Sequence, residues 1–163
     1  MTAPETLPTL VLLLARLERL NESFMAGVCR RHDISPSELR VLAMLRHRTD
    51  AGRVSPSQLA EWIVQTSGGL TATLHRLEEA DHVVRVEDPD DGRGRLVQLT
   101  DRGAAFYEAV FADLVDRYGV VFADLDQDEA LSSVRRMIEA FERHDGTVRT
   151  GDWEADVTEE ALA

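Results

Sequence analysis

The hydrophobic period of this chain changes twice, from helical to strand-like and back, and this change restricts the possible folds. Up to about residue 80, apolar residues recur at steps of three and four, which predicts helices. Between residues 83 and 99, two short β-branched or alternating segments surround a segment dense in turn formers, which predicts a hairpin. Beyond residue 100 the helical period returns. We therefore expect a mainly helical fold with one small β-hairpin.

Capping signals place the starts of the expected helices. The pairs Ser35-Pro36 and Ser55-Pro56 each set a serine cap before a proline, which is typical of the first turn of a helix. The expected starts are, in order, residue 8, Ser35, Ser55, Thr66 or Ser67, Thr100, and Asp126 or Asp128. The first helix runs to residue 31 and the fourth to about residue 80. Residues 49–54, which contain a glycine, are expected to form a loop.

Three compact helices followed by a hairpin form the winged helix-turn-helix arrangement. The expected strands are Val83 to Val86 and Leu96 to Leu99. The first helix and the last two lie outside that unit, and their apolar stripes are wide for so small a core. We expect them to pack against a second copy of the chain in a homodimer. The predicted parts are an N-terminal dimerisation helix (1–34), the winged unit (35–100), C-terminal dimerisation helices (101–144) and an acidic tail (145–163), partly disordered or docked.

The net charge of −12 by itself argues against a nucleic-acid-binding protein. Its distribution changes this interpretation, because residues 145–163 hold six acids and one arginine. Residues 30–53 instead carry six arginines against three acids. DNA binding by the winged unit thus stays open. The alternative that the net charge favours is an acidic winged-helix module that binds other proteins without strong DNA affinity.

The helix expected over residues 67–80 separates apolar from small and polar residues. Leu70, Leu74 and Leu77 fall on one face. The opposite face is small or polar, with Gly68, Ala72, His75 and Glu79, flanked by Thr71 and Arg76. A helix that enters the major groove needs small side chains for close approach, and hydroxyls and a cation for phosphates and base edges. This face is the candidate recognition surface, and an ordinary solvated helix is the alternative.

The hairpin tip is the second candidate for DNA contact. Asp91-Gly92-Arg93 places an acid two residues before an arginine. An arginine at a wing tip can enter the minor groove, where the potential is most negative. Asp91 can support the guanidinium through a charge-assisted hydrogen bond, and Arg95 is suited to a phosphate. An ordinary charged turn is the alternative.

Two spaced motifs and a helix entry carry a family resemblance. Asp88-Pro89-x-Asp91-x-Arg93 and Leu99-Thr100-x-x-Gly103 follow a segment running from Thr66 through Glu78, and Ser35-Pro36-x-Glu38-Leu39 opens an earlier helix. In these residues the chain resembles the MarR (multiple antibiotic resistance regulator) family, whose pattern has D-P-x-D-x-R and then L-T-x-x-G. Asp81-His82 stands where the family usually has a glycine and an apolar residue.

The resemblance implies a dimeric transcriptional regulator, most often a repressor, which binds a pseudo-palindromic double-stranded DNA operator and is released by a small ligand. The implied major-groove residues are Thr66, Ser67, Gly68, Thr71, His75 and Arg76. Arg93 becomes the minor-groove residue, with Asp91 as its support and Arg95 as a phosphate contact. Arg40 and Arg53 are weaker phosphate candidates.

A small aromatic or anionic effector is expected at the junction between the winged unit and the dimerisation helices. Apolar residues of the first helix and of the helix after Thr100 would line that site, with Arg16 or Arg19 as anion anchors. Cys29, beside two arginines that can lower a thiol's pKa, offers a further alternative: a thiol- or metal-responsive regulator using Cys29 and His32.

Other classes of function find little support. No nucleophile elbow, phosphate loop or paired catalytic motif is found, so we expect neither enzymatic activity nor a cofactor. The longest strongly apolar run, Leu10 to Ala15, is too short for a membrane span. A single cysteine excludes an intramolecular disulfide framework and fits a cytoplasmic protein.

Overall fold

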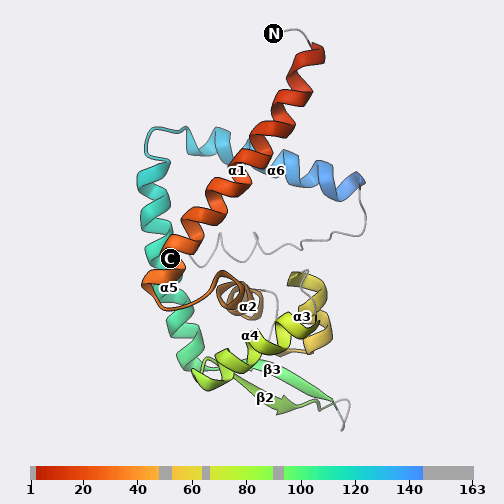
Figure 1. Ribbon diagram of the computed structural model, residues 1–163, viewed down its shortest axis with the longest axis vertical. Helices are drawn as coiled ribbons and strands as arrows, with labels where there is room; N and C mark the ends of the chain where they lie inside the picture. The colour runs from red at the N-terminus through yellow and green to blue at the C-terminus, as the bar shows by residue number, and fades with distance from the viewer. Residues whose placement is uncertain (1–2, 48–52, 64–66, 90–93, 145–163) are drawn as a thin grey trace.

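The computed structural model describes residues 3–47, 53–63, 67–89 and 94–144 (Figure 1). In chain order its elements are α1 (Ala3–Arg31), α2 (Pro36–His47), β1 (Arg53–Val54), α3 (Pro56–Ile63), α4 (Ser67–Glu79), β2 (Val83–Glu87), β3 (Arg95–Leu99), α5 (Asp101–Val121) and α6 (Gln127–His144). This order confirms a mainly helical fold with a small antiparallel wing. The predicted acidic tail lies outside the described residues.

Local capping contacts begin the helices where the sequence predicts them. At α2 the capping box is reciprocal: the Glu38 N–H donates to Ser35 Oγ at 3.2 Å, and the Ser35 N–H donates to Glu38 Oε2 at 2.7 Å. Ser55 and Gln58 make the same pair of contacts at α3. Thr100 caps α5 by accepting the N–H of the third helical residue at its Oγ1, 2.9 Å away. These three starts depend on neighbours in sequence, which is why the pattern reveals them.

Each strand of the predicted hairpin is one residue longer than expected, and two larger differences concern α1 and residues 49–54. Helix α1 begins at Ala3 rather than at residue 8, because its first turns carry no apolar period that would show them. Residues 49–54 were expected to form a loop, but Arg53–Val54 is the strand β1, in which Val54 pairs with Val97 of β3. A two-residue strand is too short to show alternation. The wing is therefore a three-stranded antiparallel sheet in the order β1-β3-β2.

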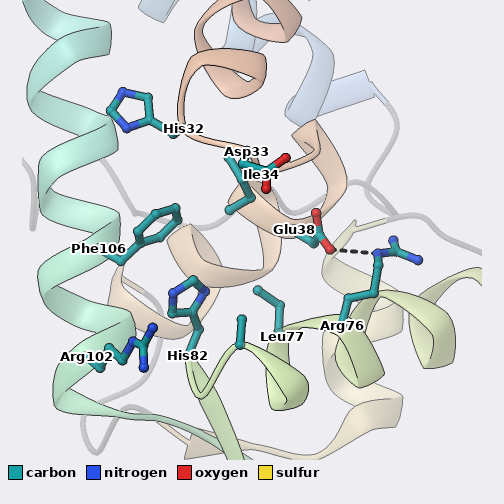
Figure 2. Close-up of a pocket in the computed structure, with 10 residues that line it drawn as sticks. His32, Asp33, Ile34, Glu38, Arg76, Leu77, His82, Arg102 and Phe106 are labelled. Atoms are coloured by element: carbon teal, nitrogen blue, oxygen red, sulfur yellow. Dashed lines mark hydrogen bonds and ion pairs between the residues drawn. The ribbon is translucent and has the colours of Figure 1, made fainter.

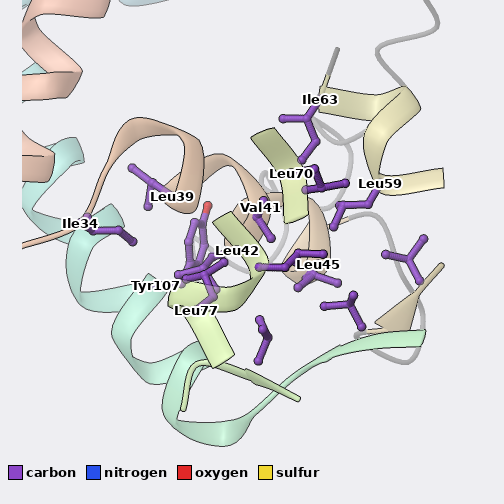
Figure 3. Close-up of a cluster of buried hydrophobic side chains, with 14 of the residues drawn as sticks. Ile34, Leu39, Val41, Leu42, Leu45, Leu59, Ile63, Leu70, Leu77 and Tyr107 are labelled. Atoms are coloured by element: carbon purple, nitrogen blue, oxygen red, sulfur yellow. The ribbon is translucent and has the colours of Figure 1, made fainter. Parts of the chain in front are cut away.

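The core joins the wing to four helices and to the end of α1, which contributes Cys29. It lies where α2, α3, α4 and α5 meet the sheet, as Figure 3 shows for the buried leucines of α2 and α4 around Tyr107. Its largest side chains below 2% exposure are Leu42, Leu45, Leu59, Leu74, Leu77, Val41, Val97 and Val110. Burial of this apolar surface fixes the orientation of α4 relative to the wing.

The terminal helices pack together but leave much apolar surface uncovered. Helix α1 crosses α5, where the rings of Phe24 and Tyr118 lie 4.7 Å apart and the Tyr118 hydroxyl donates to Asn21. Helix α6, which starts after the capping carboxylate of Asp126, has no buried residue. The exposed apolar side chains include Leu10, Leu13, Leu17 and Leu20 of α1 and Leu131, Val134 and Phe141 of α6. None of the helices in the described residues has the length and apolar character needed to cross a bilayer.

Candidate nucleic-acid interface

Helix α4 divides into a buried and an exposed face as the sequence predicts. Leu70, Leu74 and Leu77 are buried in the core. The opposite and flanking positions are exposed: Gly68, Thr71, Ala72, His75, Arg76 and Glu79. Figure 1 shows α4 between α2 and the strands of the wing, with α3 beside its first turns. The outward side of α4 therefore offers small and polar groups to an approaching molecule.

The first turn of α4 is open around its glycine. A β-carbon added to Gly68 would meet no atom within 4 Å, so packing does not require the glycine there. The turn is instead held from within, since the buried Thr73 donates from Oγ1 to the Gly69 carbonyl at 3.0 Å. The sequence reasoning missed Thr73, because an interior helical threonine bonded to its own helix leaves no pattern.

Arg76, a predicted contact residue of α4, is tied to another helix. Its Nε–H donates to Glu38 Oε1 of α2 at 2.7 Å, and its side chain remains 52% exposed. Glu38 is 8% exposed. Burial alone would raise the pKa of this carboxyl, but hydrogen bonds from Ser35 and Arg76 outweigh burial and hold the pKa below its usual value. Glu38 is thus an ionised and buried hydrogen-bond partner of Arg76. The sequence reasoning did not assign it to the site.

His75 faces the same exposed side and meets a carboxylate of its own helix. Its Nδ1 lies 3.3 Å from Glu79 Oε2, one turn further along, and both side chains are about two-thirds exposed (68% and 67%). This pair places a donor and a negative charge next to each other on the outward surface. The carboxylate of Glu79 is unfavourable for an approaching phosphate.

The predicted wing residues are described only in part. Thr66, Asp91 and Arg93 lie outside the described residues. Arg95 begins β3 and is half exposed, with Nη1 at 3.4 Å from Glu87 Oε1 across the hairpin. The N–H of Asp88 donates to the Gly94 carbonyl at 3.3 Å and closes the described part of the turn.

The two weaker phosphate candidates stand on other elements. Arg40 is exposed on α2, and Arg53 is exposed in β1 opposite Gln98 of β3. Neither belongs to the outward face of α4. The predicted DNA-contact residues therefore lie on α4, on the wing and on α2.

Comparison with known proteins identifies the arrangement. The model of the MarR family matches residues 32–94, which hold the elements from α2 to β2. The regulator PecS of Dickeya dadantii is 29% identical over 138 residues, 84% of this chain and 82% of PecS. Over residues 32–94 the chain is thus similar to the MarR family. Its fold matches a MarR mutant from Escherichia coli solved with operator DNA (25% identity, TM-score 0.67, 86% of this chain and 98% of that one).

A second structural match was also solved with DNA. Sco3205 of Streptomyces coelicolor is a MarR-family transcriptional regulator with 26% identity and a TM-score of 0.64, covering 85% of this chain and 88% of its own. This similarity to transcriptional regulators supports the prediction that the chain is not an enzyme.

The chain has a cleft of about 470 Å³ at the junction of the winged unit and α5 (Figure 2). Figure 2 shows Arg102 and Phe106 of α5 on one wall, and Glu38 and Arg76 on the other. The ring of His82 stacks on Phe106 at 4.3 Å, and burial together with Arg102 lowers the pKa of the imidazole.

The junction was the expected place for a ligand, and Phe106 of α5 lines the cleft as expected, but the expected anion anchors do not. Arg16 and Arg19 lie on the exposed part of α1 and do not line the cleft. The arginines that do so are Arg76 and Arg102. These residues come from α4 and α5, and the pattern within either helix gives no sign that they meet.

Cys29 does not have the surroundings of a reactive thiol. Its side chain is 0% exposed, and burial raises its pKa despite the positive charge of Arg40. The expectation that neighbouring arginines lower this pKa is therefore wrong. His32, its suggested partner, lies instead at 3.0 Å from the carboxylate of Asp113 on α5. Within the described residues no three histidine, cysteine or carboxylate side chains gather around a common point.

Proposed function

We propose that the chain is a MarR-family regulator which binds a pseudo-palindromic operator as a homodimer, with the α4 helix of each subunit in successive major grooves. The observation that carries the proposal is the outward face of α4, where Gly68, Thr71, Ala72 and His75 are exposed while the leucines behind them are buried. Arg93 of each wing, supported by Asp91, enters the adjacent minor groove. The two similar proteins solved with DNA support DNA binding by this fold.

The uncovered apolar surface supports the dimer. On α1, Leu10, Leu13, Leu17 and Leu20 are between 37% and 59% exposed, although they form one stripe of the helix. Contiguous exposed apolar surface of this kind is typical of a protein–protein interface. A two-fold partner would cover this stripe and the apolar side of α6, and would set the two α4 helices about one DNA turn apart.

Fluorescence anisotropy with DNA from upstream of the gene tests the DNA contact. Affinity should fall steeply between 50 and 200 mM salt, because phosphate contacts release counterions. Arg93→Ala should weaken binding about tenfold. The control is Arg136→Ala on α6, at the opposite end of the molecule from the wing, which should bind like the wild type (Figure 1).

The acidic interaction module is the competing outcome. It predicts no salt-sensitive binding to that DNA and none in a selection from fragments of the whole genome. Equal affinity of the wild type and Arg93→Ala would leave DNA binding in place and remove the minor-groove role of Arg93.

We further propose that the regulator is a repressor released by a small aromatic carboxylate in the cleft beside α5. The cleft holds two arginines for the carboxylate and the ring of Phe106 for the aromatic part, in a volume typical of ligand sites. Benzoate should raise the melting temperature and release the operator, whereas neutral benzamide should do neither. Arg102→Ala should abolish both effects. Unchanged melting in benzoate, with operator binding intact, would refute the effector alone.

A further inference from the structure

The two carboxylate oxygens of Glu38 make contacts on two different helices. Oε2 accepts the Ser35 N–H at 2.7 Å and completes the cap of α2. Oε1 accepts the Arg76 Nε–H at 2.7 Å and so reaches α4, 38 positions along the chain. The side chain of Glu38 is only 11% exposed, whereas that of Arg76 is 52% exposed. A buried anchor therefore holds one end of an exposed guanidinium.

Arg76 sits at the edge of the DNA-facing side of α4. Counting 100° per residue, it lies beside Ala72 and toward α2, away from the centre of the exposed face. Side chains at such an edge reach the phosphates that border a groove rather than the bases within it. Among the described residues, Glu38 is the hydrogen-bond partner of this guanidinium, and it engages Nε alone. The two terminal amino groups are left as the donors for a phosphate.

We propose that Glu38 is a positioning residue for operator binding, which holds the Arg76 guanidinium in place to receive a DNA phosphate. The inference rests on the proposed function, because it concerns how the same α4 surface meets DNA. An arginine side chain is flexible, and binding must otherwise fix its rotamer. The ion pair orders the side chain before the phosphate arrives.

Glu38→Gln separates the two contacts of this residue. Glutamine serves equally well at this position of a capping box, so the cap of α2 is kept. The charged anchor for Arg76 is lost. We expect operator affinity to fall about fivefold, as for loss of one hydrogen bond. The slope of log affinity against log salt should become shallower by about one, as for loss of one phosphate contact.

Three controls distinguish positioning from a structural role. Ser35→Ala removes the other half of the cap, so its melting temperature should fall while its operator affinity and salt slope stay unchanged. Arg76→Ala should weaken binding about as much as Glu38→Gln. In the Arg76→Ala background, Glu38→Gln should cause no further loss, because its effect passes through the guanidinium.

Two results would overturn the role of Glu38 while leaving operator binding established. One is wild-type affinity and salt slope for Glu38→Gln. The other is an equal loss from Glu38→Gln with and without Arg76. Absence of salt-sensitive binding by the wild type is a different failure, which removes the proposed function and the positioning role together.

Discussion

Gly103 lies so close to His82 that a β-carbon built on the glycine would stand 2.0 Å from the His82 carbonyl oxygen. The same oxygen accepts hydrogen bonds from the backbone N–H and from Oγ1 of Thr100, each at 3.1 Å. These contacts join the start of α5 to the turn after α4. These contacts explain the spacing Leu99-Thr100-x-x-Gly103. The threonine donates hydrogen bonds to the His82 carbonyl, and only a glycine at position 103 leaves room for that carbonyl.

Gly103→Ala should lower the free energy of unfolding by about 1–3 kcal/mol, because the neighbouring atom belongs to the backbone and cannot swing aside. Denaturant unfolding measures the change. Gly119→Ala in the same helix is the matched control, since a β-carbon there meets nothing within 4 Å. That variant should gain up to about 1 kcal/mol from better helix propensity. Similar losses at both positions would contradict the steric explanation.

Asp81→Gly should stabilise the fold. Asp81 ends α4 at φ 58°, the left-handed region that favours glycine. Around it the His82 N–H bonds the Leu77 carbonyl at 2.9 Å and the Asp81 N–H bonds the Glu78 carbonyl at 3.0 Å, which is a Schellman motif. Glycine should raise the free energy of unfolding by about 0.5–1 kcal/mol. Asp101→Gly in the first turn of α5 should have the opposite sign, and a loss of stability in Asp81→Gly would refute this reasoning.

The sequence reveals contacts between near neighbours better than contacts across the fold. The caps at Ser35 and Thr100 involve partners three residues away, so their spacing is visible in the chain. The aspartate at position 81 is visible as a departure from a family glycine, but its backbone conformation is not. The strand β1 was missed because its two residues are ordered only by pairing with β3.

The candidate site follows the same rule. The division of α4 into two faces arises within one helix, and the period of its leucines predicts it. The bond between Glu38 and Arg76 joins α2 to α4. The capping-box pattern predicts the contact of Glu38 with Ser35 but not its contact with Arg76. The cleft likewise depends on Arg102 and His82 meeting through the packing of α5 against the turn after α4.

Glu79→Gln should strengthen operator binding about two- to fivefold, because it removes a negative charge from the face turned to the phosphates. The carboxylate is 67% exposed and is paired with His75 one turn earlier. Glu139 on α6 forms a similar pair with Arg143, so Glu139→Gln is a matched control that should leave affinity unchanged. Anisotropy titrations at low salt measure both. Weaker binding by Glu79→Gln would instead indicate that the carboxylate makes a favourable contact in the complex.

Asp113→Asn should destabilise the protein at neutral pH but not in strong acid. Asp113 on α5 accepts from His32 at 3.0 Å and from Arg117 at 2.8 Å, and lies 3.5 Å from Arg31. The hydrogen bond from His32, and then the arginines, hold its pKa below the usual 3.8 despite partial desolvation. A carboxyl whose pKa is lower in the folded than in the unfolded protein stabilises the fold at pH values above its unfolded-state pKa. This stabilisation is lost as the pH falls through the folded-state pKa. The difference in melting temperature between wild type and variant should therefore shrink as the pH falls below 3.8. Asp116 is exposed on the same helix, so Asp116→Asn serves as the control. If the difference in melting temperature for Asp113→Asn persisted unchanged into acid, the ionisation of Asp113 would not be what joins α5 to the end of α1.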